Sequence, residues 1–362
     1  MVPKHTQLDF SGQHVFVGLD VHKRSWNVTI LIGDLTHKTF SQPPNVEMLV
    51  KYLHHYFPKA EYHCVYEAGY CGFWIHDALR AKGVGCHVIN AADVPTTDKE
   101  KRNKTNKVDS RKLARGLHNG ELQPIYVPSR KALEDRSLVR ARRALVSKQT
   151  RCKNQIKGLL SFYGVPIPED LADRYWSKRY IAWLESLRMQ YASGDYSLQL
   201  LLKELGQLRQ SILEITRVIR ALSQQEPYVT HVAHLVTIPG ISTVTAMILL
   251  TELISVSRFG SLDDIASFVG LVPSEKSSGD DRNITDITPR KNPYLRWVLV
   301  ESAWVAVRLD PTLALAFAKL TKRMPANRAI IRIARKVLNR IRFVLKNQKP
   351  YVMLPHAQGG MA

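Results

Sequence analysis

The chain has 362 residues, of which 45% are hydrophobic, so it is long enough for two or three packed domains and is not mainly disordered. Its 52 Lys and Arg residues outnumber 31 Asp and Glu, and the net charge of +21 favours nucleic acid as a partner. The four cysteines form no CxxC pair, so neither a zinc site nor a disulfide framework is indicated, and a reducing cytoplasm fits. There is no signal-peptide core and no apolar stretch of the roughly 18 residues that a membrane-spanning helix needs, so we expect a soluble protein.

The N-terminal third alternates between strand-like and helix-like patterns. Segments 15–23 and 25–33 are rich in β-branched and aromatic residues, and 37–42 is a weaker third strand, which together predict an antiparallel meander. Further on, helices are predicted over 46–56 and 73–82, and strands over 62–67 and 86–90. Strands followed by alternating helices and strands predict a mixed α/β sheet.

The middle of the chain is predicted to be helical. After a loop at 121–128, apolar residues recur with three-four spacing at Leu198, Leu201, Leu205, Leu208, Ile212, Ile215, Ile219 and Leu222. This is the pattern of a coiled-coil seam. An earlier helix with a looser apolar stripe, from Leu138 to Leu159, is one partner that would pack antiparallel to it. A second copy of the chain is the other, and sustained heptads favour dimerisation.

From residue 227 onward we expect a helical region interrupted by a polar loop at 272–290. Residues 235–253 predict a helix-hairpin-helix with Pro239 and Gly240 at the turn, where free N–H groups would hold a phosphate. A simple turn between packed helices is the alternative. Basic residues gather in 129–160 and after Asp310, where no acidic residue follows, and these are candidate phosphate-facing surfaces. Within the last region, Arg328, Arg332, Arg335 and Arg342 share one face of the final helix.

Three carboxylates stand at positions that suit a metal-dependent nuclease. Asp20 closes the apolar run VFVGLD, Glu67 closes EYHCVYE, and Asp109 lies three residues after Asn106 on one face of a predicted helix. Carboxylates gathered in a basic protein suggest a divalent cation facing a phosphate backbone. Taken singly, each has an ordinary structural explanation, such as a turn, a surface acid or a helix N-terminus.

Two other features are weaker by themselves. Ser277 and Ser278 precede Gly279 in the polar loop, where serine and glycine are common for conformational reasons alone. The aromatic residues around Glu67, among them Tyr70 and Trp74, are able to stack on bases, but the core and rim of the first domain is the favoured explanation for them.

Several spaced motifs resemble one known family. GLDVHK, YEAGY, KTNKVDSRKLA, IPGISTVTA, RFGSLDDIASFVGLVPSEKSSG and KNPYLRWVLVESA resemble, in order, the motifs of the IS-one-ten insertion-sequence transposases, relatives of the Piv DNA invertase. The resemblance implies a RuvC-like (RNase H fold) metal-dependent nuclease domain over 1–125, a helical linker and coiled coil over 126–225, and a transposase domain over 226–362 with a catalytic serine loop.

The resemblance also implies site residues. An acidic tetrad that binds Mg²⁺ maps to Asp20, Glu67, Asn106 and Asp109, and the serine nucleophile maps to Ser278, with Ser277 as the local alternative. Asn106 departs from the family pattern, which has an aspartate there. Because an amide oxygen brings no charge, metal affinity should fall.

We therefore expect an RNA-guided DNA recombinase that cuts and rejoins strands through a phosphoserine intermediate with metal assistance. The family implies donor and target DNA, a structured non-coding guide RNA, and a homo-oligomer, dimer or tetramer, whose subunits share the site. One alternative is a RuvC-like Holliday-junction resolvase that uses metal-activated water. Another is a non-catalytic nucleic-acid-binding scaffold, which the neutral Asn106 makes credible.

Overall fold

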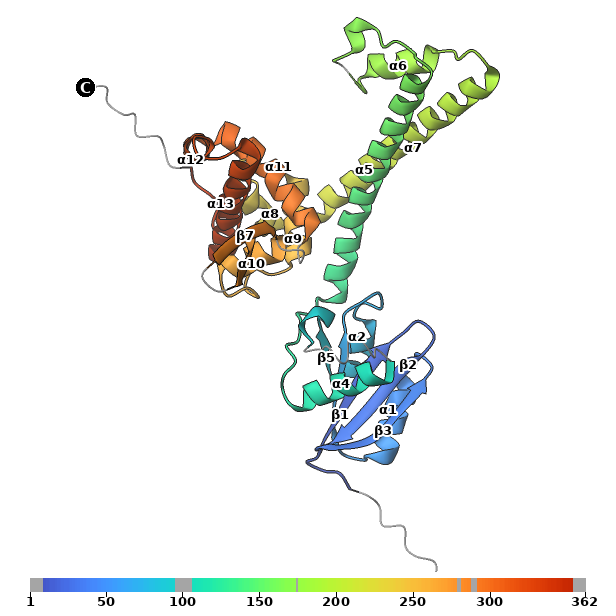
Figure 1. The fold of residues 1–362 in the computed structure, drawn as a ribbon, viewed down its shortest axis with the longest axis vertical. Helices are drawn as coiled ribbons and strands as arrows, with labels where there is room; N and C mark the ends of the chain where they lie inside the picture. Colours follow the sequence, from blue (N-terminus) through green and yellow to red (C-terminus); the bar gives the residue numbers. More distant parts are fainter. Residues whose placement is uncertain (1–8, 95–105, 174, 279–280, 288–291, 354–362) are drawn as a thin grey trace, which may run out of the picture. The chain divides into compact units, whose positions relative to one another are not determined.

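The computed structural model describes residues 9–94, 106–173, 175–278, 281–287 and 292–353 (Figure 1). The chain divides into two compact units, one ending at Val127 and the other starting at Pro128, and each is described by itself. No helix within these ranges is both long enough and apolar enough to cross a membrane.

The first unit is built on a five-stranded mixed sheet with the order β3-β2-β1-β4-β5 (Figure 1). The predicted meander is confirmed, with β1 (His14–Val21), β2 (Trp26–Ile32) and β3 (Leu35–Gln42) pairing antiparallel in sequence. The two later strands, β4 (Glu61–Glu67) and β5 (Gly85–Ile89), extend the sheet parallel to β1. In the described part of the unit the helices are α1 (Val46–Tyr56), α2 (Trp74–Ala81), α4 (Asn106–His118) and the short η1 (Ala91–Asp93).

The sheet is covered on one face by α1 and α2 and on the other by α4. On one face Val17, Leu19 and Cys64 pack in a core with Leu49 and Leu53 of α1 and with α2. On the other face Val65 packs with Ile89 and with Leu113 of α4. Such double coverage explains the nearly continuous apolar run that ends at Asp20.

The second unit begins with two long helices, α5 (Arg130–Phe162) and α7 (Ala192–Leu222), which are joined through η2 (Glu169–Leu171) and α6 (Lys178–Ser186). Cys152 lies against Leu201 and Arg142 against Thr216, so residue numbers fall on one helix as they rise on the other and the pair is antiparallel. The predicted seam residues Leu198, Leu205 and Leu208 are buried in a core that includes Ile156 of α5. The seam of α7 therefore packs against α5 of the same chain, which is the first of the two partners considered for it.

The rest of the second unit is a helical bundle that contains a β-hairpin. Its helices are α8 (Val229–Leu235), α9 (Thr243–Leu253), α10 (Leu262–Val269), α11 (Pro293–Leu309), α12 (Pro311–Thr321) and α13 (Ala326–Asn347). Between α8 and α9 the chain turns at Gly240, whose φ is +88°. A Cβ at Gly240 would lie 2.3 Å from the Ser302 carbonyl oxygen of α11, so only glycine fits this turn.

The prediction of a polar loop over 272–290 is wrong for most of the residues of this segment that the structure describes. Residues Pro273–Ser278 form β6 and Asp281–Ile287 form β7, an antiparallel pair in which Ser278 lies opposite Asp281. The serine, glycine and aspartate content of the segment predicted a loop, whereas pairing between the two halves satisfies their backbone groups, and this long-range effect outweighs local propensity.

Candidate active site

Asp20 and Glu67 are neighbours across the sheet. In the parallel pairing of β1 and β4, Leu19 lies opposite Tyr66, and Asp20 and Glu67 are the next residue on each strand. Adjacent strands are about 4.8 Å apart, and residues at the same level project to the same face. Both carboxylates are half-buried, and 17% of the Asp20 side chain is exposed.

Helix α4 packs directly on the face of the sheet to which Asp20 projects. Gly18, two residues before Asp20 and therefore on the same face, has no side chain to separate the backbones. A Cβ there would lie 2.1 Å from the Ser110 carbonyl oxygen and 2.5 Å from the Ala114 nitrogen. The Ser110 hydroxyl is 2.9 Å from that of Thr29, which lies opposite Gly18 on β2, and this buried hydrogen bond fixes the helix along the sheet.

The direction of α4 follows from its contacts with β1. His118, the last residue of the helix, contacts the Phe16 ring edge-on with centroids 5.0 Å apart, whereas Ser110 lies above Gly18. The helix therefore runs antiparallel to β1, and its first turn points toward the end of the strand that bears Asp20. Asp109 is in this part of the helix and is half-buried.

Three of the four predicted tetrad positions thus converge on one edge of the sheet from three different elements. Asn106 is the first residue of α4, but its side chain lies outside the described residues. The carboxylate oxygens of Asp20, Glu67 and Asp109 do not all come within 4.8 Å of one another among the described side chains. Since like charges repel, a cation between them would be needed to draw them closer.

His22 is an additional polar group beside the carboxylates. Its Nε2 lies 3.0 Å from Oδ2 of Asp20, so the ring orients that carboxylate and, when protonated, forms an ion pair with it. From the sequence alone, assistance of proton transfer by His22 and simple phosphate contact beside Lys23 are equally credible, so neither role is favoured. The sequence signal for its position beside Asp20 is that His22 follows Asp20 by two residues at the end of a strand, where the chain turns back after Val21.

A cavity of about 400 Å³ opens beside this edge of the sheet. His22, Lys23, Tyr70 and Trp74 are part of its lining, and Val21, Trp26, Pro44 and Cys71 complete it. Tyr70 and Trp74 are exposed, and the Lys23 ammonium lies 5.8 Å from the Tyr70 ring centroid. By contrast Tyr66 is fully buried, so of the aromatics around Glu67 this one belongs to the core.

The predicted nucleophile lies in the second unit. Ser278 is the last residue of β6 and Ser277 precedes it, and the side chains of both lie outside the described residues. The backbone assigns them to the hairpin between α10 and α11.

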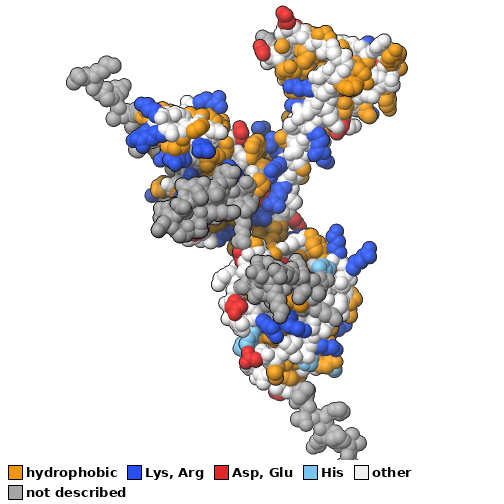
Figure 2. All heavy atoms as spheres, in the orientation of Figure 1, with side chains coloured by type: hydrophobic (Ala, Val, Ile, Leu, Met, Phe, Trp, Pro, Cys, Tyr) orange, Lys and Arg blue, Asp and Glu red, His pale blue; other side chains and the backbone are white. Residues whose placement is uncertain are grey.

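Lys and Arg side chains are spread over α5 and the helical bundle in Figure 2. Several of those on α5 have structural partners. Arg140 forms a bidentate pair with the buried Glu252 at 2.7 and 2.8 Å, and Arg136 donates to the Thr251 carbonyl oxygen. Burial is the largest single influence and would raise the pKa of Glu252. The hydrogen bonds and charge of Arg140, the hydrogen bond from Asn292 and the charge of Arg136 together outweigh it and hold the pKa below its usual value. The basic cluster of 129–160 therefore serves internal packing in part, whereas Arg328 and Arg332 of α13 are exposed.

Comparisons with known proteins match both units. A profile described as the Transposase IS116/IS110/IS902 family matches residues 232–318, and a DEDD-type transposase profile of the IS110 group matches residues 17–165. The candidate transposase y4rJ of Sinorhizobium fredii is 30% identical over 307 residues, covering 78% of this chain and 76% of the relative. The transposase for insertion sequence element IS1111A of Coxiella burnetii is 24% identical over 260 residues, covering 69% of each chain. The transposase for insertion sequence element IS1533 of Leptospira borgpetersenii is 24% identical over 250 residues, covering 66% of this chain and 69% of that one.

Proposed function

Because the chain belongs to the IS116/IS110/IS902 family of transposases, which cut and rejoin DNA, we propose that Asp20, Glu67 and Asp109 form its metal-dependent cleavage site. The observation that carries the proposal is the packing of α4 on Gly18, antiparallel to β1, which directs Asp109 toward the edge occupied by Asp20 and Glu67. Three partly buried carboxylates from three elements are a donor set that suits a hard divalent cation such as Mg²⁺.

Each residue has a distinct task in this proposal. Asp20 and Glu67 supply ligand oxygens from the rigid sheet, and His22 keeps the Asp20 carboxylate in place. Asp109 supplies a third carboxylate, and Asn106 would add a neutral amide oxygen in the same turn of α4. When bound, the cation polarises a phosphoryl oxygen of the scissile phosphate and stabilises the leaving oxygen.

The strand-exchange chemistry is assigned to Ser278. Its hydroxyl oxygen would form a bond to phosphorus as the bond between phosphorus and one deoxyribose oxygen breaks, and the serine proton would end on that departing oxygen. A hydroxyl of the new DNA partner would then reverse this step and release the serine, so the number of phosphodiester bonds is conserved and no ATP is needed. The family resemblance is the support for this residue, with Ser277 as its neighbour and alternative.

The pocket at the same end of β1 supports nucleic acid as the ligand of this edge. Tyr70 and Trp74 offer exposed aromatic faces on which an unpaired base would stack, and Lys23 and His22 suit its phosphate. The net charge of +21 adds a favourable sequence-independent attraction for DNA. By resemblance we further propose that a structured non-coding RNA guides target choice and that the active species is a homo-oligomer whose subunits share the site.

A trapping experiment tests the proposal. Purified protein would be incubated with Mg²⁺, its cognate RNA and DNA bearing the element's ends, and the products would be separated on a denaturing gel. We expect a DNA-linked protein band that Ser278→Ala abolishes and Ser277→Ala retains, and loss of all cutting in Asp20→Asn with DNA binding kept.

Each other outcome favours a different function. Free cut ends with no adduct would indicate a hydrolase of the resolvase type that uses metal-activated water. Binding without cutting in the wild-type protein, and identical behaviour of Asp20→Asn, would indicate a scaffold. An adduct that persists in Ser278→Ala but is lost in Ser277→Ala would transfer the nucleophile to Ser277.

A further inference from the structure

A second cluster of metal-ligating side chains lies at the other end of the same strands. His14 is the first residue of β1, Glu61 is the first residue of β4, and the two are direct partners in the parallel register. His63 follows Glu61 by two residues and therefore projects to the same face of the sheet. Asp20 is six residues further along β1, roughly 20 Å away at about 3.3 Å per residue, so this cluster is separate from the cleavage site.

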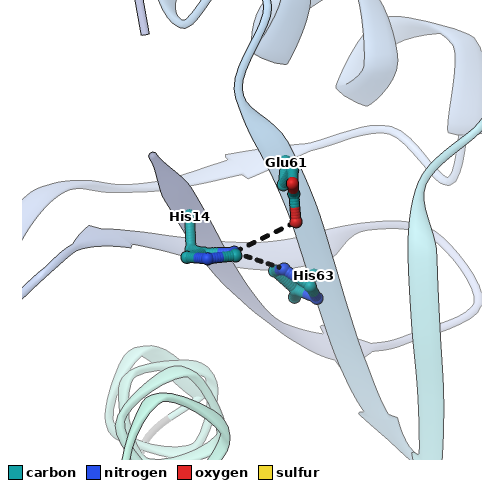
Figure 3. Close-up of side chains that lie close together, drawn as sticks. All are labelled: His14, Glu61 and His63. Carbon is teal, nitrogen blue, oxygen red and sulfur yellow. Dashed lines mark hydrogen bonds and ion pairs between the residues drawn. The ribbon is translucent and has the colours of Figure 1, made fainter. Parts of the chain in front are cut away.

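The ligand atoms of these three side chains are already gathered. Nδ1 of His14 lies 3.0 Å from Nε2 of His63 and 3.3 Å from Oε2 of Glu61. Figure 3 shows the His14 ring directed at both partners, which point back at it from the neighbouring strand. In a tetrahedral site with metal–ligand bonds of about 2.0–2.1 Å, neighbouring ligand atoms are roughly 3.3–3.4 Å apart. Small side-chain adjustments are all that an ion would require, including a separation of the two imidazole nitrogens by a few tenths of an ångström.

Hydrogen bonding alone satisfies the cluster poorly. If Nδ1 of His14 carries a proton and Nε2 of His63 does not, that single proton faces two acceptors, and if both carry one, the two N–H groups face each other. If Nδ1 of His14 carries none, its lone pair faces the Glu61 carboxylate. A cation bound to all three atoms removes this conflict.

The chemistry of the donors selects the class of metal. Two imidazole nitrogens and one carboxylate oxygen suit zinc and similar divalent transition ions, whereas Mg²⁺ requires oxygen ligands. His14 and Glu61 are exposed, so an ion would enter from solvent and a water would complete the fourth position. The ring of His63 is also held in place, because Phe16 stacks on it with centroids 5.4 Å apart.

We propose that His14, Glu61 and His63 bind one divalent transition-metal ion of the zinc class. The ion joins the first residues of β1 and β4 and so fastens the end of the sheet that is opposite the cleavage site. It takes no part in cutting DNA. The absence of CxxC pairs is no obstacle, because the site uses no cysteine.

Titration of the full-length chain with Zn²⁺ alone, monitored by calorimetry, tests this proposal. We expect one equivalent to bind the wild-type protein with an affinity that His63→Ala lowers at least tenfold. Co²⁺ in place of Zn²⁺ should give the visible absorption of a tetrahedral site in the wild type and none in the variant. Glu61→Gln is a second variant that should also lower the Zn²⁺ affinity. It changes an exposed side chain to one of the same size, so the protein should still fold.

Two controls distinguish this site from other sources of binding. His54→Ala removes an exposed histidine of α1 and should leave the titration unchanged. Asp20→Asn should also leave it unchanged, even though it abolishes cleavage, so failure of the cleavage proposal would not affect this test. Equal Zn²⁺ affinity in the wild type, His63→Ala and Glu61→Gln, or no Co²⁺ absorption in the wild type, would overturn the proposal.

Discussion

Replacement of Gly18 by alanine tests the contact on which the geometry of the cleavage site depends. The added Cβ would lie 2.1 Å from the Ser110 carbonyl oxygen, 2.5 Å from the Ala114 nitrogen and 3.0 Å from Cβ of Leu113. Ordinary contacts begin at about 3.5 Å, so α4 must move outward by roughly 1.4 Å. Two of the three obstacles are helix backbone, which cannot be relieved by a change of rotamer.

The displacement should affect stability and activity differently. Overpacking of this kind costs about 1–3 kcal/mol of unfolding free energy. Because α4 carries Asp109 while Asp20 and Glu67 stay on the sheet, the same movement separates the proposed ligands. A misplacement of about 1 Å can cost on the order of a hundredfold in rate, and we expect a loss of that size.

Excision of a marked element from a plasmid, together with thermal unfolding of the purified protein, measures both effects. Gly69→Ala is the matched control, because its Cβ would meet only the Glu67 carbonyl oxygen, at 4.0 Å. Excision by Gly18→Ala within twofold of the Gly69→Ala control, with equal melting temperatures, would refute the proposed packing of α4 and the convergence derived from it.

Three further predictions concern other parts of the chain. Glu252→Gln should destabilise the second unit by about 2 kcal/mol, less than a fully buried pair because the Arg140 side chain is 55% exposed. Since the pKa of Glu252 is lowered in the folded state, its stabilising effect is complete above its ordinary value of 4.5 and disappears as the pH falls below it. Chemical denaturation from pH 7 to pH 3 should therefore show a weaker pH dependence in the variant, and parallel curves would contradict this. Asn106→Asp should raise Mg²⁺ affinity in calorimetry because it adds a charge, and an unchanged affinity would remove this position from the ligand set. Trp74→Leu should weaken binding of single-stranded DNA by about 1–3 kcal/mol, measured by fluorescence anisotropy, while duplex binding changes little; equal losses on both would exclude base stacking in the pocket.

Local patterns in the sequence determined most individual elements. The high content of β-branched and aromatic residues located β1 and β2, and the three-four spacing of leucine and isoleucine located α7. The helix predicted over 46–56 has the observed bounds because Asn45 caps it, its side chain accepting from the Met48 N–H. Such patterns depend on a few neighbouring residues, so each can be recognised in the sequence without knowledge of the segment that packs against it. The same holds for the acids that end strands, which placed Asp20 and Glu67 at one edge of a sheet.

Tertiary structure alone decided which segments meet. The register that places Asp20 beside Glu67 and the direction of α4 depend on contacts such as Thr29 with Ser110, which are 81 residues apart in the chain. The seam of α7 could close within or between chains, and only the pairing with α5 resolves it in this chain. The strands of the hairpin at β6 and β7 and the cluster around His14 and His63 gave no local signal for the same reason. Pairing energy is gained between distant residues, and no short window of sequence contains both partners.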